Sequence, residues 1–144
     1  MSGNKLVTPG DLRALTENAQ RAKVQEQFDR ARKLEEEQKS LRESFMSRDV
    51  HPQVMERVNA AVRRAAEQGL HEIEVIKFPA EFCNDKGRRI NNGEADWPNS
   101  LEGFAKHAYE FFVKELQPAG FKVRAQVLNY PEGRLGDIGL FLSW

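Results

Sequence analysis

Residues 121–144 read FKVRAQVLNYPEGRLGDIGLFLSW, and this stretch decides the fold that we expect. Apolar and polar residues alternate from Phe121 to Tyr130, which is the pattern of a β-strand with one buried face. A turn rich in proline and glycine follows. The last segment, Asp137 to Trp144, is more apolar and has small residues, Gly139 and Ser143, between its large ones. Such a strand suits the centre of a sheet, with a neighbour on each side.

A further strand is predicted upstream, from His71 to Phe78, because glutamates alternate there with Ile73 and Val75. Pro79 ends this strand. We expect the sheet order 71–78, 137–144, 121–130, in which neighbouring strands are antiparallel. The rival order, with residues 121–130 in the middle, has an ordinary right-handed crossover and stays open.

A long helix is predicted from Thr8 to Ser47. Thr8 can cap its N-terminus, Pro9 suits the first helical position, and Asp11 suits the positive end of the helix dipole. Beyond Gly10 the segment contains neither glycine nor proline, and strong helix formers dominate it. The helix has about 39 residues and a length of roughly 58 Å.

Two shorter helices are predicted in the remainder of the chain. For the first, Asp49 is the expected cap, Pro52 lies in the first turn, and Gly69 ends the helix. For the second, Ser100 is the expected cap and Pro118 is the stop. We expect both helices to cover the same face of the sheet.

The expected fold class is therefore α+β, in two parts. Residues 1–47 form a long charged amphipathic helix with the pattern of a coiled coil. Residues 48–144 form a compact α-β-α-β-β domain with a three-stranded sheet that helices cover on one face. A length of 144 residues agrees with one domain and an appendage.

The long helix carries a thin apolar stripe that suits a second helix better than a core. Apolar residues recur at spacings of three and four, as in a coiled coil, and Gln38 interrupts the stripe. An isolated helix of this kind is only marginally stable, because propensity alone contributes little. We therefore predict a homo-oligomer, most simply a dimer, whose partner is a second copy of the chain. Its interface would comprise Val24, Phe28, Leu34, Leu41 and Phe45.

The uncovered face of the sheet is a second predicted interface. Strict alternation puts these side chains on it: Glu72, Glu74, Ile76, Phe78, Lys122, Arg124, Gln126, Leu128, Tyr130 and Phe141. We expect its apolar end, Phe78, Tyr130 and Phe141, to be covered by the long helix, a loop or another chain. Aromatic and basic side chains on a small sheet also suit single-stranded nucleic acid, which is an alternative function. The chain lacks the βαββαβ order and any RNP-like motif, which argues against nucleic acid.

The polar loop from Ala80 to Asn99 offers a third candidate site. Arg88 and Arg89 follow a glycine there, and arginine forks suit phosphate or carboxylate groups. Together with Asn91 and Trp97 they would bind a small ligand if the loop forms a concave pocket. Neither the Walker pattern nor GxGxxG occurs in the chain, so a surface turn is the simpler interpretation.

The sequence contains no convincing catalytic or metal-binding set. Cys83 with His107 as base is a conceivable nucleophile pair, but no family signature surrounds either residue, and we expect Cys83 to be chemically dispensable. The histidines lie on three separate segments, at His51, His71 and His107. Four loop carboxylates lack the spacing of a calcium loop: Glu81, Asp85, Glu94 and Asp96. We predict no catalytic residue, no metal and no cofactor.

The charge balance and the single cysteine bear on the expected partners and cellular compartment of the protein. Lys and Arg, 22 in total, balance 22 Asp and Glu, so composition draws the chain neither to nucleic acid nor to a membrane. A single cysteine, no apolar signal segment and no apolar stretch of bilayer length indicate a cytoplasmic protein. The predicted function is non-enzymatic self-association in protein interaction, with nucleic-acid or small-ligand binding as the alternatives.

Overall fold

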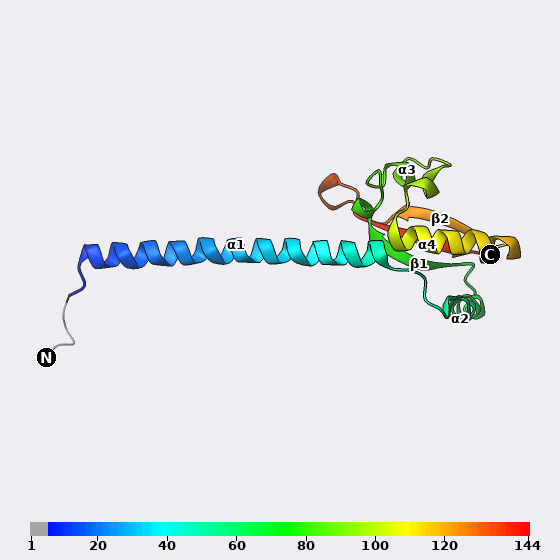
Figure 1. Ribbon diagram of the computed structural model, residues 1–144, viewed down its shortest axis with the longest axis horizontal. Helices are drawn as coiled ribbons and strands as arrows, with labels where there is room; N and C mark the ends of the chain where they lie inside the picture. The colour runs from blue at the N-terminus through cyan, green and yellow to red at the C-terminus, as the bar shows by residue number, and fades with distance from the viewer. Residues whose placement is uncertain (1–5) are drawn as a thin grey trace. The chain divides into compact units, whose positions relative to one another are not determined.

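The computed structural model describes residues 6–144 (Figure 1). The fold is α+β, as the sequence predicts. Its main elements in chain order are α1 (Pro9–Ser47), α2 (Val54–Glu67), β1 (Glu72–Pro79), α4 (Gly103–Phe111), β2 (Lys122–Val127) and β3 (Asp137–Ser143). Short helical turns fill the connections: η2 (Ala80–Phe82), α3 (Arg88–Asn91), η3 (Trp97–Ser100), η4 (Phe112–Leu116), η5 (Gln117–Ala119) and η6 (Pro131–Gly133). Within the described residues, no helix is both long enough and apolar enough to span a membrane.

The chain divides into two units at Leu41/Arg42, six residues before the boundary that the sequence suggested. The first unit, Met1–Leu41, contains α1 up to Leu41. The second, Arg42–Trp144, is called the compact unit below, and it includes the last turn of α1. The reason is Phe45, whose ring packs within the compact unit against those of Phe78 and Phe82, at centroid distances of 5.4 and 4.8 Å.

The sheet has the order β1-β3-β2, and both pairs of neighbours are antiparallel, as predicted. The central strand β3 carries the three best-buried side chains of the sheet, Ile138, Leu140 and Leu142, which are 0 to 2% exposed. Burial on this scale requires a neighbour on each edge and a covered face, which is what the apolar pattern of the strand indicated.

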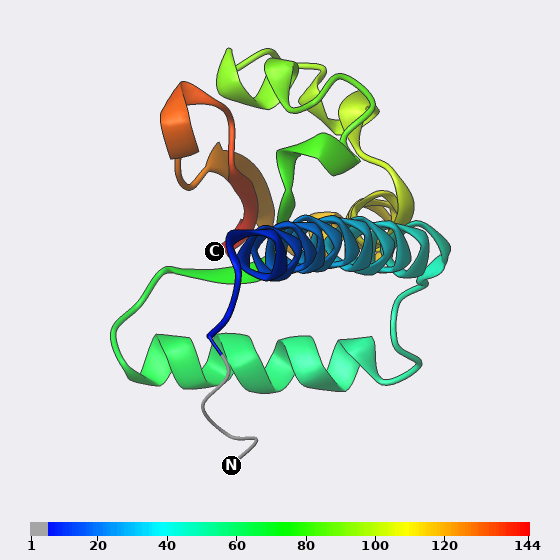
Figure 2. The same cartoon turned by 90° about the vertical axis from the view of Figure 1, so that its left-hand side faces the viewer.

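The helices α2 and α4 cover the same face of the sheet. Leu142 of β3 packs with Phe112 and Leu116, which continue α4, and half-buried Val58 and Val62 of α2 join this cluster. Figure 2 shows α2 along its length, with the chain passing from its C-terminal end into β1. The expected covering of one face by these helices is confirmed.

A β-bulge in β1 overturns the expected placement of two side chains. The register shifts between Glu74 and Ile76, so one extra residue reverses the alternation from there on. Ile76 lies opposite Leu140, and Phe78 lies opposite Ile138, so both are on the helix-covered face. The prediction that they lie on the open face is wrong, because counting by twos assumes an uninterrupted strand.

The helix ends that depend on local sequence are confirmed. The backbone N–H of Asp11 donates to Thr8 Oγ1 at 3.2 Å, so Thr8 caps α1. After α2, Gly69 has a φ of 83°, and the N–H of Leu70 donates to the Ala65 carbonyl at 2.9 Å. This is the Schellman arrangement, in which a left-handed residue satisfies the last carbonyls of the helix.

Two predicted caps are wrong. Asp49 Oδ1 accepts from the adjacent Val50 N–H at 2.7 Å, and Gln53 precedes α2 without a side-chain cap. Ser100 is fully buried, and its hydroxyl donates to the Trp97 carbonyl at 2.6 Å. Ser100 is the last residue of η3, and Leu101 and Glu102 after it are extended, so α4 begins only at Gly103.

Candidate functional site

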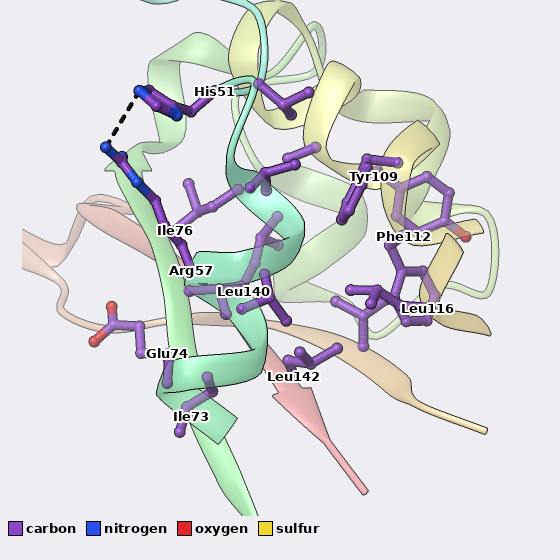
Figure 3. A pocket seen from close by; sticks show the side chains of 18 of the residues that line it. His51, Arg57, Ile73, Glu74, Ile76, Tyr109, Phe112, Leu116, Leu140 and Leu142 are labelled. Carbon is purple, nitrogen blue, oxygen red and sulfur yellow. Dashed lines mark hydrogen bonds between the residues drawn. The ribbon is translucent and has the colours of Figure 1, made fainter. Parts of the chain in front are cut away.

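A cavity of about 350 Å³ lies in the compact unit, between α2, α4 and the helix-covered face of the sheet (Figure 3). It is called the α2 cavity below. Most of its lining is apolar and comes from all three elements, including Val54, Val58, Ala61, Ile73, Ala108 and Leu140. Nothing in the sequence indicates the space that separates these residues.

Small side chains and shallow burial explain why the cavity exists. Ala65 is the single buried residue of α2, although the helix is strongly amphipathic. Val54 and Val58 remain half-buried, and Ala61 is exposed, because they face the cavity. Ala108 meets the cavity from α4 with another methyl group. The apolar face of α2 is therefore left without complete packing.

Two polar side chains border the α2 cavity near the start of α2. The guanidinium Nη2 of Arg57 lies 3.2 Å from Nε2 of His51, as the dashed line in Figure 3 marks. His51 Nδ1 accepts a hydrogen bond from the backbone N–H of Gln53 at 3.0 Å. No carboxylate of the described chain lies within ion-pair distance of Arg57.

Residues 9–41 of α1 present the predicted stripe to solvent. α1 has no buried residue among those described. The large apolar side chains of the stripe are all more than half exposed: Val24 65%, Phe28 65%, Leu34 58% and Leu41 66%. Phe45 differs from them, since it is half-buried in the compact unit.

The open face of the sheet is occupied by an internal ion pair. Arg124 donates to both carboxylate oxygens of Glu72, at 2.7 and 2.6 Å, and its guanidinium lies 4.2 Å from the ring centre of Phe141. The hydrogen bond from Arg124 lowers the pKa of Glu72, and the same bond raises the pKa of Arg124. The arginine fork is therefore already satisfied by a carboxylate.

The three aromatic residues predicted to be covered lie in different environments. Phe78 is 3% exposed and belongs to the core, so it is not at a surface. Phe141 is half-buried beneath Arg124. Tyr130 is 55% exposed, and its hydroxyl donates to Asn91 Oδ1 at 3.0 Å. Phe78 is buried as expected, with Phe45 of α1 as part of its cover. Within its own chain Tyr130 is exposed, and its cover by another chain stays a prediction.

In the 80–100 loop the arginines are paired with the loop's own carboxylates. Arg88 lies 3.9 Å from Glu94, and Arg89 lies 3.5 Å from Asp96. Trp97 packs edge-on against Tyr109 of α4, with ring centres 5.7 Å apart, which pins the loop to the compact unit. None of the four predicted ligand-binding residues, Arg88, Arg89, Asn91 and Trp97, lines the α2 cavity.

Cys83 lies in the core and is 4% exposed. Burial raises the pKa of its thiol to about 11, so the thiolate is disfavoured at neutral pH. His107, the base considered with it, places Nδ1 2.8 Å from the Arg48 carbonyl. Among the described residues, no group of three or more His, Cys, Asp or Glu side chains is arranged to hold a metal ion.

Comparison of the chain with protein-family models, with curated proteins and with solved structures found no match.

Proposed function

We propose that this protein is a non-enzymatic interaction module that self-associates through α1, with a second copy of the chain as its partner. The proposal is carried by six positions of α1 at alternating spacings of three and four. These positions are called the α1 seam: Val24, Gln27, Ala31, Leu34, Gln38 and Leu41. A repeat of 3.5 residues on average is the pattern of a two-stranded left-handed coiled coil.

Exposure supports the seam as a docking face. Val24, Leu34 and Leu41 are each 58 to 66% exposed, and Phe28, beside the seam, is 65% exposed. Burying such a side chain fully stabilises an association by about 1.5–3 kcal/mol. Gln27 and Gln38 are polar seam positions, which lower the affinity of a coiled coil and fix its register.

Flanking charges support a parallel, in-register pair. In such a pair, residue 30 of one helix approaches residue 35 of the other, and residue 37 approaches residue 42. These positions hold Arg30 and Glu35, then Glu37 and Arg42, so both contacts join opposite charges. Arg30 bonds Glu26 of its own helix at 2.6 Å, an exposed ion pair that is weak enough to be exchanged.

The stripe available to a partner ends at Leu41. Phe45 continues the same spacing, but its ring packs on Phe78, Phe82 and Phe104 inside the compact unit. We therefore remove Phe45 from the proposed interface and keep Val24, Phe28, Leu34 and Leu41.

Sedimentation velocity of the full chain and two double variants tests the proposal. Leu34→Lys with Leu41→Lys places four charges in the seam of a dimer and should give a monomer at about 10–50 μM, where moderate interfaces still form. Leu12→Lys with Leu15→Lys is the matched control, since these leucines are also exposed on α1 and lie outside the seam. The wild type and the control should be dimers. A monomeric wild type, or equal dissociation of both variants, would refute the proposal.

The alternative functions have less support. A nucleic acid on the open face would have to displace Glu72 from Arg124, and a small anion at the 80–100 loop would compete with Glu94 and Asp96. We also propose that the protein is cytoplasmic, which its single, buried Cys83 supports and cell fractionation would test.

A further inference from the structure

The α2 cavity has a polar end at which two hydrogen-bond donors face each other. The backbone N–H of Gln53 can only donate, so His51 Nδ1, its partner at 3.0 Å, must be the acceptor nitrogen. The proton of the neutral imidazole is then on Nε2. Arg57 Nη2, which is always a donor, lies 3.2 Å from that nitrogen. Both side chains are exposed, so water reaches them, and an acceptor placed beside both would replace that water and bond to two donors at once.

The side chains that border the cavity do not supply this acceptor. Glu74 borders it, but a Cβ built on Gly139 would lie 3.1 Å from Glu74 Oε1, beside the ring of Phe141. The carboxylate is therefore on the open face, on the other side of the sheet from α2. In Figure 3 it points away from the side chains that converge between α2 and α4. The cavity thus joins an apolar interior to a cationic end.

The volume sets the size of the occupant. A cavity of about 350 Å³ is within the range of small-molecule sites and is more than twice the size of an apolar cavity that holds benzene. At about 30 Å³ for each non-hydrogen atom with its hydrogens, the cavity accommodates a ligand of roughly 12 non-hydrogen atoms. The space lies between the helices and the sheet and is partly open to solvent at Ala61, which suits a slender molecule better than a folded partner.

We propose that the α2 cavity binds a single-chain aliphatic carboxylate of medium length, whose chain fills the apolar interior and whose carboxylate accepts hydrogen bonds from His51 and Arg57. The lining along the chain would be Val54, Val58, Ala61, Ile73 and Ala108. A carboxylate has two oxygens and matches the paired donors, whereas an alcohol of the same chain length matches the interior alone. The site lies wholly in the compact unit and does not depend on self-association of α1.

Titration of the isotope-labelled full chain with octanoate and with 1-octanol, followed by amide chemical shifts, tests the site. Both ligands should shift amides of α2, α4 and β1. Arg57→Gln should weaken octanoate at least about tenfold and 1-octanol less than about threefold, since the carboxylate contact alone is lost. Arg63→Gln is the control, because Arg63 is an exposed arginine of α2 that does not border the cavity, and it should change neither affinity.

A second set of variants tests the site by filling the cavity. Ala108→Leu adds side-chain volume inside it and should weaken both ligands more than about tenfold while circular dichroism shows the helices retained. Ala61→Leu fills the same space from α2 and replaces that variant if Ala108→Leu does not fold. The proposal is overturned if wild type shows no saturable shifts with octanoate up to about 1 mM. It is equally overturned if Arg57→Gln weakens both ligands alike, or if the filled variants still bind.

Discussion

Replacing Gly103 with alanine should loosen the last turn of α1 from α4. Gly103 has a φ of 56°, and a Cβ there would lie 2.6 Å from the Met46 Cα and 2.7 Å from the Phe45 carbonyl oxygen. Both are backbone atoms, so neither can swing aside as the end of a flexible side chain does. The left-handed conformation costs alanine about 1–2 kcal/mol, and overpacking adds about 1–3 kcal/mol. We expect the free energy of unfolding to fall by about 2–5 kcal/mol.

Gly93→Ala separates the steric part of this loss from the conformational part. Gly93 also has a positive φ, 66°, but nothing lies within 4 Å of a Cβ built there. This control should lose only about 1–2 kcal/mol. Urea unfolding, followed by the fluorescence of Trp97 and Trp144 in the compact unit, measures both variants. Each kcal/mol lowers the Tm of a domain of this size by about 4–8 °C, so Gly103→Ala should melt well below the control. If the two variants unfold within about 0.5 kcal/mol of each other, the tight contact between α1 and α4 does not exist.

Two further predictions follow from charge and burial. Arg30→Glu should weaken the dimer, because it turns an attraction across the α1 seam into a repulsion, and adding Glu35→Arg should restore the dimer affinity. Sedimentation equilibrium measures both affinities. A double variant that dimerises as weakly as Arg30→Glu alone would contradict the parallel register. The Cys83 thiol, with its pKa raised to about 11, should resist a thiol reagent at pH 8 until urea is added. Between pH 9 and 11 the wild type should lose more stability than Cys83→Ser does. The sign follows because the unfolded thiol ionises first, near pH 9, so rising pH favours the unfolded chain; rapid labelling of the folded protein would contradict the buried placement.

The sheet order could be predicted because one strand differs from the others in composition. Strand β3 combines large apolar residues with Gly139 and Ser143, and a strand of this kind needs cover and neighbours that only the centre provides. The ends at Thr8 and Gly69 were predictable for another reason. Both caps use atoms within a few residues of the helix end, so the local sequence contains all the information.

The remaining features depend on contacts that the sequence does not display. Alternation cannot show a bulge, because Glu74, Val75 and Ile76 are compatible with either register, and only the burial of Phe78 against the core selects one. The sequence likewise does not show that the Ser100 hydroxyl donates to the Trp97 carbonyl within the loop. The α2 cavity was equally hidden, since the sequence gives the size of its lining residues and not the distance between the elements that carry them.

The apolar stripe of α1 shows how one periodic pattern can serve two purposes. Spacing alone assigns Leu41 and Phe45 to the same face, four residues apart, and nothing local distinguishes them. Leu41 is 66% exposed, whereas Phe45 contacts three aromatic rings of the compact unit. Loss of the Phe45 ring therefore acts on the stability of the compact unit, and loss of Leu34 or Leu41 acts on association. The two effects fall on different residues of one stripe. A variant that changes the stability of the compact unit without changing association, or the reverse, therefore tests the division of α1 at Leu41 directly.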